Sequence, residues 1–441
     1  MAALEGQAER FPSVLIAEPD CGALDPRDAG LARAIYEASM RRWLTLEAMY
    51  GVHVDRPVDQ LSPAVRAALV AGAAQLVLLD RVPVHAAIDE TVERVKGRMP
   101  KASGLVNAVL RRTSEMLVGE PEEMEWDWER DWAGPRHAVP MGDGRWQRLA
   151  GDVLPEDPMT RLAVATSVPE TLIRRWMTWL PAERVRQIAW SGLEPAPIVV
   201  NATHAGWLPT EDAVPHDEGG FVVYTGSTAA LGDWLGRHPG CWVQDVSSAG
   251  AVLSVADDAG GASSPGLVVD LCAGQGTKTR QLAAVFPDAK IVATDVDEKR
   301  FATLARVFAD DERVDVVPAD GVLAAVGGKA DLVLLDVPCG NSGVIGRRIE
   351  ARYRADRRAV QRLNDTQRQV IVDAMPMVAE GGRLIYATCS VEREENERVV
   401  AWARKSHDLR PRRDRRAWPT GGDGASPAEH RDGAYSCVLM R

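Results

Sequence analysis

The sequence has few cysteines, and none of them falls in a metal-binding pattern. Six cysteines are scattered over 441 residues, with no CxxC pair and no histidine and cysteine group at zinc-ligand spacing. In a reducing compartment such thiols stay free, which argues against both a disulfide framework and a zinc site. We therefore expect no metal, and core packing or catalysis remain as roles for the thiols.

Long apolar runs are also missing. No stretch approaches the roughly 18 uninterrupted apolar residues of a membrane span, and the N-terminus shows no basic-plus-apolar signal peptide. We therefore expect a cytoplasmic protein without a membrane partner. The sequence has no internal repeat, and its length predicts two or three domains.

Net positive charge is missing too, since the formal net charge is −11. This argues against a surface that coats nucleic acid everywhere. The charge is uneven, however: residues 115–131 are strongly acidic, residues 347–368 carry eight arginines against three acids, and residues 404–416 are again rich in arginine. A basic patch beside a motif matters more for RNA binding than net charge does, although such a stretch can also be a solvated helix face.

The N-terminal part of the sequence has a helical pattern. Residues 28–112 have apolar residues at helical spacing, and Ser62 followed by Pro63 is typical of a helix N-terminus. The sequence therefore predicts an all-helical domain over residues 1–115. Residues 116–160 are acidic and rich in tryptophan, proline and glycine, which indicates a linker or irregular insertion.

The rest of the chain alternates strands and helices. Residues 161–245 combine segments of helical pattern with two candidate short strands, "PAPIVVNAT" and "GFVVYTG". This combination predicts a small α/β subdomain. Residues 246–441 repeat strand, glycine turn and helix, with near-continuous Val/Ile/Leu runs. This rhythm predicts a parallel sheet covered by helices on both faces, and "GAYSCVLMR" is a further candidate strand.

Acidic residues gather at the predicted strand ends beside a glycine turn. "VVDLCAGQG" places Asp270 near the end of the first strand and Gly274 and Gly276 in the turn. The turn is neither a GxGxxG fingerprint nor a Walker loop. Asp295 and Asp320 follow the next two strands, where acids can bind a ribose and an adenine edge. Acids here can simply cap helices, but the three together favour S-adenosylmethionine, a nucleoside without phosphates.

Two further apolar runs each end at one cysteine, "DLVLLDVPCG" at Cys339 and "RLIYATCSV" at Cys389. A single cysteine is more often a buried small hydrophobe than a nucleophile. Two of them on neighbouring strand ends favour chemistry: a thiolate that adds to carbon 6 of cytosine makes carbon 5 nucleophilic. We expect a helix to begin beside Cys389 and favour its thiolate. The carboxyl group of Asp336 can bind the cytosine ring nitrogen.

These segments resemble a known family. "DLCAGQGTKT", "DVPCGNSGVI" and "YATCSVEREEN" are similar to the cofactor, "PC" and "TC" motifs of RNA 5-methylcytosine methyltransferases of the NOL/Nop2/Sun type. "GAAQLVLLDRVPVHAAIDETVE" and "GLVNAVLRR" resemble a NusB-like RNA-binding domain, which favours the RsmB (Sun/Fmu) branch. The resemblance covers nearly the whole chain. It implies a multidomain protein, with an all-α NusB-like N-terminal domain and an α/β Rossmann-like (class I) methyltransferase domain.

The resemblance also implies residue roles. Cys389 is expected as the nucleophile, Cys339 as the residue that assists product release, and Asp336 as a contact to cytosine. The residues expected to bind S-adenosylmethionine are Asp270, Cys272, Ala273, Gly274, Gly276, Lys278, Asp295, Asp320 and Asp336. Those expected to bind RNA are Arg347, Arg348, Arg352 and Arg354.

The expected function is therefore S-adenosylmethionine-dependent formation of 5-methylcytosine in RNA, with 16S ribosomal RNA as the favoured substrate and a monomer as the expected state. Two alternatives stay open. One is a non-catalytic RNA-binding or ribosome assembly factor on the same fold. The other is the same chemistry on transfer RNA.

Overall fold

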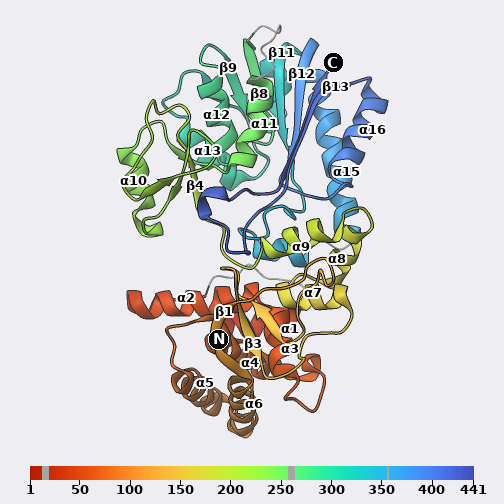
Figure 1. Ribbon diagram of the computed structural model, residues 1–441. Coiled ribbons are helices and arrows are strands. Elements are labelled where there is room, and N and C mark those ends of the chain that lie inside the picture. The colour runs from red at the N-terminus through yellow and green to blue at the C-terminus, as the bar shows by residue number, and fades with distance from the viewer. Residues whose placement is uncertain (12–18, 257–263, 355–356) are drawn as a thin grey trace. The chain divides into compact units, whose positions relative to one another are not determined.

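The computed structural model describes residues 1–11, 19–256, 264–354 and 357–441, and it forms two compact units (Figure 1). Unit 1 consists of Met1–Ala196, Ile345–Arg354 and Gly421–Ala425. Unit 2 consists of Pro197–Val344, Ala355–Thr420 and Ser426–Arg441. Among the described helices, none is both long enough and apolar enough to span a membrane.

Unit 1 is built mainly from helices. They are α1 (Ala2–Arg10), α2 (Pro26–Arg41), α3 (Trp43–Gly51), α4 (Pro63–Leu78), α5 (Val84–Arg98), α6 (Ser103–Glu115), α7 (Pro158–Thr166), α8 (Glu170–Met177) and α9 (Ala182–Trp190). Helix α4 starts at Pro63 with Ser62 as its N-cap, as predicted. It packs against α1, α2, α3, α5 and α6, and Gly72 lets Leu110 of α6 approach its backbone closely. The prediction of an all-helical N-terminal fold is confirmed.

Residues 116–160 contain regular structure where the sequence predicts an irregular linker. Strands β1 (Leu117–Glu123), β2 (Ala138–Pro140) and β3 (Arg145–Leu149) form an antiparallel sheet in the order β1-β3-β2. Val139 and Leu149 are buried in the same core as the N-terminal helices, and the rings of Trp128, Trp146 and Trp190 lie within 6.0 Å of one another. The acidic composition conceals the strands because the acids of β1 are exposed.

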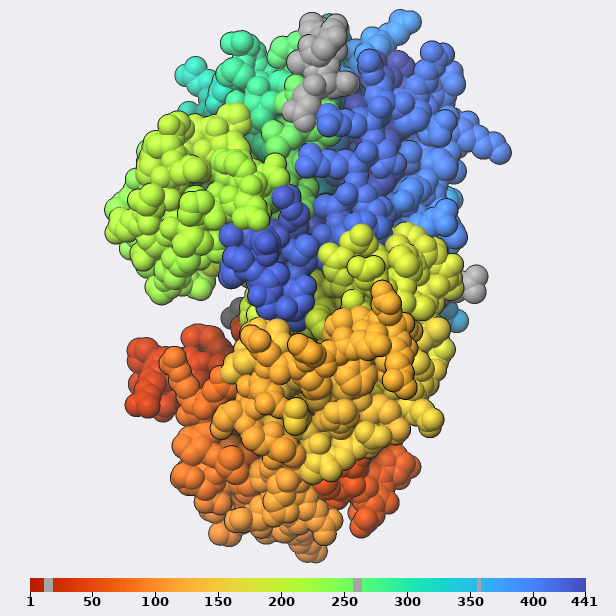
Figure 2. Space-filling view, in the orientation of Figure 1, coloured from red at the N-terminus to blue at the C-terminus, as the bar shows by residue number. Residues whose placement is uncertain are grey.

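The segment 161–245, expected as one subdomain, is divided between the units at Ala196 and Pro197. Helix α7 is tied to α3, since Thr45 Oγ1 donates to the Val164 carbonyl at 2.6 Å. Unit 2 begins with strands β4 (Ile198–Asn201), β5 (Ala213–Pro215), β6 (Phe221–Tyr224) and β7 (Trp242–Val243) and helix α10 (Leu231–Arg237). These strands form a sheet in the order β5-β6-β4-β7 around buried Trp234, and Figure 2 shows this part as a yellow-green lobe. The domain boundaries remain a prediction.

The second sheet of unit 2 has seven strands in the order β10-β9-β8-β11-β12-β14-β13. Its strands are β8 (Leu267–Asp270), β9 (Lys290–Ala293), β10 (Val314–Val316), β11 (Ala330–Asp336), β12 (Val378–Thr388), β13 (Arg410–Ala417) and β14 (Ala434–Met440). Its helices are α11 (Val246–Ala256), α12 (Thr277–Val285), α13 (Glu298–Val307), α14 (Val322–Val326), α15 (Arg357–Ala374) and α16 (Glu397–His407). In sheet order, the five strands β10, β9, β8, β11 and β12 run parallel to one another. Strand β14 is antiparallel to both of its neighbours, β12 and β13.

Both faces of this sheet are covered, as predicted. Leu332 and Leu334 of β11 lie in one core, whereas Val333 and Leu335 lie in the other. This alternation follows from the two-residue period of a strand. The C-terminal segment forms β14, as predicted, whereas β13 was not predicted from the sequence.

Short 3-10 helices occur in both units. They are η1 (Val58–Gln60), η2 (Pro100–Ala102), η3 (Thr228–Ala230), η4 (Ala319–Gly321), η5 (Ile349–Tyr353), η6 (Met375–Met377) and η7 (Pro427–Glu429).

Candidate active site

The two thiols lie side by side at the carboxyl end of the sheet. Strands β11 and β12 are parallel neighbours with Asp336 opposite Ala387, so the loops that follow them leave the sheet together. Cys339 lies three residues after β11 and Cys389 directly after β12, and their Sγ atoms are 3.3 Å apart. Both cysteines are free and half-buried. The site therefore brings together two cysteines that are 50 residues apart in the chain.

The segment after Cys389 corrects one expectation, because α16 begins only at Glu397. Polar side chains hold the intervening residues in turns. Asn396 Nδ2 donates to the Ser390 carbonyl at 2.8 Å, and Thr388 Oγ1 donates to Asn396 Oδ1 at 2.6 Å. Cys389 therefore lies at a strand end but not at a helix N-terminus.

A lysine supplies positive charge beside the thiols instead. Lys278 of α12 donates from Nζ to Asp336 Oδ2 at 2.7 Å. Burial lowers the pKa of Lys278, but the Asp336 carboxylate, with help from the charge of Cys389, raises that pKa above its ordinary value. The ammonium group is therefore firmly protonated, and it interacts electrostatically with Cys389.

Cys339 is in a different electrostatic state. Its contact with Cys389, its burial and the negative charge of Glu395 all raise the pKa of Cys339 well above its ordinary value. Because the thiolate is the nucleophilic form of cysteine, Cys339 stays a poorly nucleophilic thiol at neutral pH.

The glycine turn after β8 can receive a ligand close to its backbone. Gly274 and Gly276 have φ of +59° and +93°, and a Cβ on Gly276 would lie 2.5 Å from Phe308 Cε2. Buried Asp295 fixes the turn, since its Oδ2 accepts the Gly274 N–H at 2.9 Å. The turn leads into α12 with Gly276 as the N-cap.

Asp270 at the end of β8 is fully buried beneath this turn. Its Oδ2 accepts a hydrogen bond from Thr279 Oγ1 at 2.7 Å, while its Oδ1 has no hydrogen-bond partner within the described part of the chain. Burial raises the pKa of Asp270 to about 7. A glycine turn with an acid at the end of β8 and a second acid two residues after β9 fits a ligand that donates hydrogen bonds and carries no phosphate.

Three other residues expected to bind the cofactor differ in how far they are buried. Ala273 is buried and donates its N–H to the Thr294 carbonyl at 2.9 Å, and Cys272 is half-buried with a pKa that burial raises. Asp320 is exposed and lies in η4, because β10 already ends at Val316. The expectation that Asp320 ends a strand is therefore wrong.

The arginines expected to bind RNA divide into two kinds. Arg347, Arg348 and Arg354 are exposed. Arg352 is 1% exposed and corrects the expectation of a surface contact. Its guanidinium donates to five backbone carbonyls of unit 1, namely those of Arg41, Thr166, Ser167, Gly192 and Ile345. It is a structural residue because these carbonyls need its donors.

Two residues of the site were missed by the sequence reasoning. Glu395 is fully buried and its carboxylate accepts the Gly340 N–H at 2.9 Å, next to Cys339. Burial raises the pKa of Glu395 to about 7. Asn341 contacts both cysteines. Their positions in "PCGN" and "EREEN" give no signal without the loop geometry.

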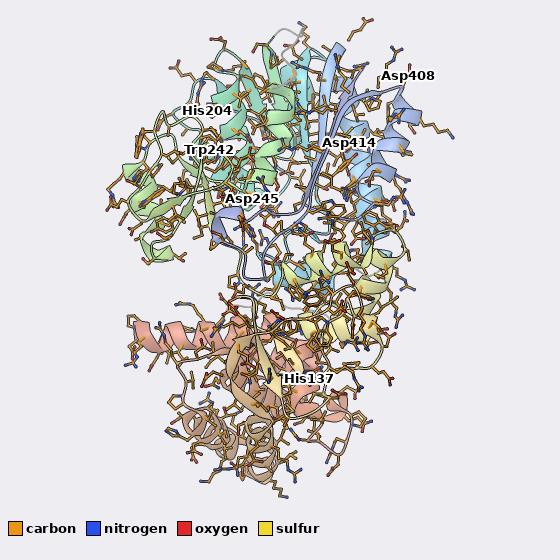
Figure 3. All side chains as sticks on the ribbon, viewed as in Figure 1. His137, His204, Trp242, Asp245, Asp408 and Asp414 are labelled. Atoms are coloured by element: carbon orange, nitrogen blue, oxygen red, sulfur yellow. The ribbon has the colours of Figure 1, made fainter. Side chains whose placement is uncertain are left out.

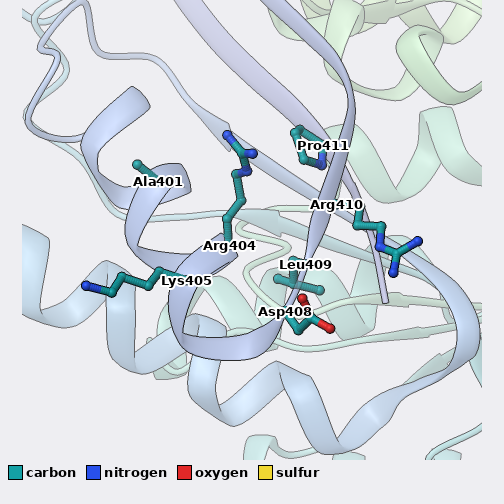
Figure 4. A pocket seen from close by; sticks show the side chains of 7 residues that line it. All are labelled: Ala401, Arg404, Lys405, Asp408, Leu409, Arg410 and Pro411. Carbon is teal, nitrogen blue, oxygen red and sulfur yellow. The ribbon is translucent and has the colours of Figure 1, made fainter.

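Unit 2 has two other features, a cluster of buried titratable side chains and a pocket. Asp245 (labelled in Figure 3), His430 and Asp432 are buried with side-chain ligand atoms within 4.8 Å of one another. Asp245 accepts the N–H groups of Ser247 and Asp432. A pocket is lined by Ala401, Arg404, Lys405, Asp408, Leu409, Arg410 and Pro411 (Figure 4). Arg410 and Arg383 both pair with Met440, so this pocket lies level with Arg383 in the middle of β12, whereas Cys389 follows the end of that strand.

Comparisons with known proteins agree with this architecture. The profile of the family "16S rRNA methyltransferase RsmB/F" matches residues 263–422, and that of the NusB family matches residues 7–115. The ribosomal RNA small subunit methyltransferase B of Erwinia tasmaniensis is 31% identical over 84% of this chain and 80% of its own length. That of Escherichia coli O127:H6 is 28% identical over 94% of this chain and 91% of its own length.

Solved structures share the fold. The crystal structure of PH0851 has a TM-score of 0.65 at 22% identity and covers 100% of this chain and 98% of that chain. A methyltransferase homolog from Pyrococcus horikoshii has a TM-score of 0.51 at 19% identity and covers 65% of this chain and 100% of its own. The larger sheet is thus that of an S-adenosylmethionine-dependent methyltransferase, and S-adenosylmethionine is the cofactor. The chain belongs to the RsmB/F family of 16S rRNA methyltransferases.

Proposed function

We propose that this chain methylates carbon 5 of a cytosine in small-subunit ribosomal RNA in the cytoplasm, with Cys389 as the nucleophile. The observation that carries the proposal is the pair of half-buried thiols 3.3 Å apart, beside Lys278, Asp336 and the glycine turn. The names of the relatives support ribosomal RNA as the substrate.

The proposed chemistry balances through one covalent adduct. The Cys389 thiolate adds to carbon 6, and the electron pair of the 5,6 double bond moves to carbon 5. S-adenosylmethionine, when bound, would supply an electrophilic methyl group to carbon 5, and its sulfonium would leave as a neutral thioether as the S–C bond breaks. Transfer of the proton from carbon 5 to solvent water then restores the double bond and expels Cys389 as a thiolate. Cys339 assists this release.

The charges favour this division of roles. Cys339 holds its proton, because Cys389, burial and Glu395 raise its pKa, whereas Cys389 lies beside the Lys278 ammonium. Asp336 is fixed by Lys278 and contacts the cytosine ring in our proposal. The residues proposed to hold the cofactor are Asp270, Cys272, Ala273, Gly274, Gly276, Lys278, Asp295, Asp320 and Asp336.

RNA binding is assigned to the NusB-like helices of residues 1–115 and to exposed Arg347, Arg348 and Arg354, through phosphate contacts that position the RNA. The target base must leave its stack to reach Cys389, as it does in other enzymes that modify bases. We propose a monomer that needs no metal.

Bisulfite sequencing of 16S ribosomal and transfer RNA from a deletion strain tests the proposal. A cytosine of 16S RNA should lose its methyl group on deletion and regain it with the wild-type gene. The Cys389→Ala variant should not restore it, whereas Cys21→Ala, which removes a buried thiol of unit 1, should. Methylation by Cys389→Ala would contradict the nucleophile assignment, and loss confined to transfer RNA would contradict the substrate.

A non-catalytic assembly factor is the rival. Calorimetry with S-adenosylmethionine separates the two, since the proposal requires binding and the rival does not. Absence of both cofactor binding and any change in RNA methylation on deletion would favour the rival.

A further inference from the structure

The loop after β11 contains a residue in an unusual backbone conformation. Asn341 has φ of +56°, one of four positive values among the described non-glycine residues. Asparagine adopts this left-handed conformation more readily than most residues, because its short amide can hydrogen-bond to the nearby backbone. The conformation points the Asn341 amide at the two cysteines.

The amide spans both thiol-bearing residues. Asn341 Nδ2 donates to the Cys339 carbonyl at 3.2 Å, and Asn341 Oδ1 lies 2.9 Å from Cys389 Sγ and 4.0 Å from Cys339 Sγ. A backbone carbonyl only accepts, so the NH₂ group of the amide must face it and the oxygen must face the sulfur. Cys389 therefore donates its S–H proton to Asn341 when it is a thiol.

The loop is held firmly enough to fix this contact. Gly343 N–H donates to the Cys389 carbonyl at 3.0 Å, and Val391 N–H donates to Ser342 Oγ at 3.1 Å. The hydroxyls of Ser342 and Ser390 are 3.0 Å apart. Three connections on the two residues after Asn341 thus tie this loop to the one that follows β12.

We propose that Asn341 is a positioning residue for the nucleophile: its amide oxygen accepts the Cys389 S–H and holds the sulfur in the orientation from which it reacts. The proposal rests on the nucleophilic role of Cys389.

The charged and titratable groups around Cys389 set the rest of its environment. Lys278 from α12 is the cation. The other titratable groups are Asp336 at the end of β11, Cys339 after it and Glu395 before α16. Asn341→Gly alters none of these groups relative to its parent, so a changed pH response of that variant reports on the amide.

The test is alkylation of Cys389 by iodoacetamide as a function of pH, in a Cys339→Ser background with peptide mapping by mass spectrometry. Mapping is needed because Cys272 is also half-buried. Asn341→Gly keeps the backbone conformation and removes the amide. Asn341→Asp keeps the shape and replaces the amide by a carboxylate.

Loss of an acceptor that favours the thiol should lower the pH midpoint of alkylation in Asn341→Gly by about 0.5 to 1, which is roughly a three- to tenfold faster reaction at pH 7. Asn341→Asp should raise the midpoint and slow the reaction. Unchanged midpoints in both variants, or a shift in the same direction in both, would overturn the proposal. A thermal unfolding curve close to that of the parent confirms that each variant is folded.

Steady-state methylation with otherwise wild-type Cys339 gives an independent result. In Asn341→Gly, kcat should fall about tenfold with little change in KM for RNA, because the freed sulfur leaves its productive rotamer. An unchanged kcat would overturn the positioning role. The alkylation result does not depend on cytosine chemistry, so failure of the proposed function and failure of this inference are distinguishable.

Discussion

At the scale of single residues, buried acids control the protonation of the site. Glu395 is fully buried, and its pKa is raised to about 7 chiefly by burial and further by the charge of Glu392. Hydrogen bonds from Gly340 and Gln367 oppose this rise but do not cancel it. Near neutral pH, Glu395 therefore changes charge next to Cys339.

Glu395→Gln should change how stability depends on pH. The folded pKa exceeds the unfolded value of about 4.5, so the folded state keeps a proton that the unfolded state releases between about pH 4.5 and 7. This contribution favours folding at low pH and is lost as the pH rises through that window. Relative to Glu395→Gln, the wild type should lose about 1–3 kcal/mol across it.

Urea unfolding at pH 5 and pH 8 measures this difference. Glu380→Gln, which changes an exposed acid, serves as the control and should follow the wild type at both pH values. A Glu395→Gln variant whose stability also falls in parallel with the wild type would show that Glu395 does not titrate in this range.

The sequence identified the residues that end apolar strands. Cys339, Cys389 and Asp336 were found because strand ends of a parallel sheet meet at one edge, and the structure places all three there. Asn341 and Glu395 could not be found, because their roles depend on a left-handed turn and on burial. Arg352 was misassigned because an arginine run looks the same whether a member is exposed or buried.

At the scale of elements, the turn between β8 and α12 shapes the proposed cofactor site. Gly276 combines a positive φ with close contact to Phe308, whereas Gly274 has a positive φ and open space where its Cβ would be. A side chain at position 274 would therefore meet backbone strain alone, whereas one at position 276 would meet both strain and crowding by Phe308.

Gly276→Ala should destabilise the turn by about 1–3 kcal/mol and weaken S-adenosylmethionine binding more than Gly274→Ala does. The reason is that only the added methyl group at 276 meets Phe308, at 2.5 Å from its ring. Calorimetric titration with the cofactor compares the two variants. Equal losses would mean that crowding at Phe308 does not matter.

The elements themselves were largely predictable from periodicity. The near-continuous apolar runs of β8, β9, β11 and β12 and the helical spacing of α2–α6 gave the right types. β13 was missed because "RPRRDRRA" is almost wholly charged, and it forms a strand by pairing with β14. Likewise, the helix start after Cys389 was misplaced because polar residues fit turns and helix ends equally well.

At the scale of the whole molecule, the units do not follow the order of the chain. Residues Ile345–Arg354 lie between parts of unit 2 in sequence but belong to unit 1. No local pattern could reveal this, because it depends on long-range contacts. Arg352 and Arg41 explain it, since Arg352 donates to the Arg41 carbonyl and Arg41 donates to the Gly346 carbonyl.

Arg352→Met should lower the stability of unit 1 by about 2–4 kcal/mol, because five buried carbonyls lose their donor. Arg354→Met, an exposed neighbour, should stay within about 0.5 kcal/mol of the wild type. Thermal unfolding of the full chain followed by tryptophan fluorescence measures both. Similar stability of the two variants would remove the structural role assigned to Arg352.

The proposed mechanism depends most on which sulfur bonds to cytosine. Mass spectrometry of a trapped protein–RNA complex measures this directly. The Cys339→Ala variant is incubated with small-subunit RNA and S-adenosylmethionine, digested with ribonuclease and protease, and analysed for a cross-linked peptide. We expect a methylated cytidine nucleotide attached to Cys389 and no such product from Cys389→Ala. A nucleotide attached to Cys339 in the Cys389→Ala variant, together with no nucleotide on Cys389 in the Cys339→Ala variant, would contradict this assignment.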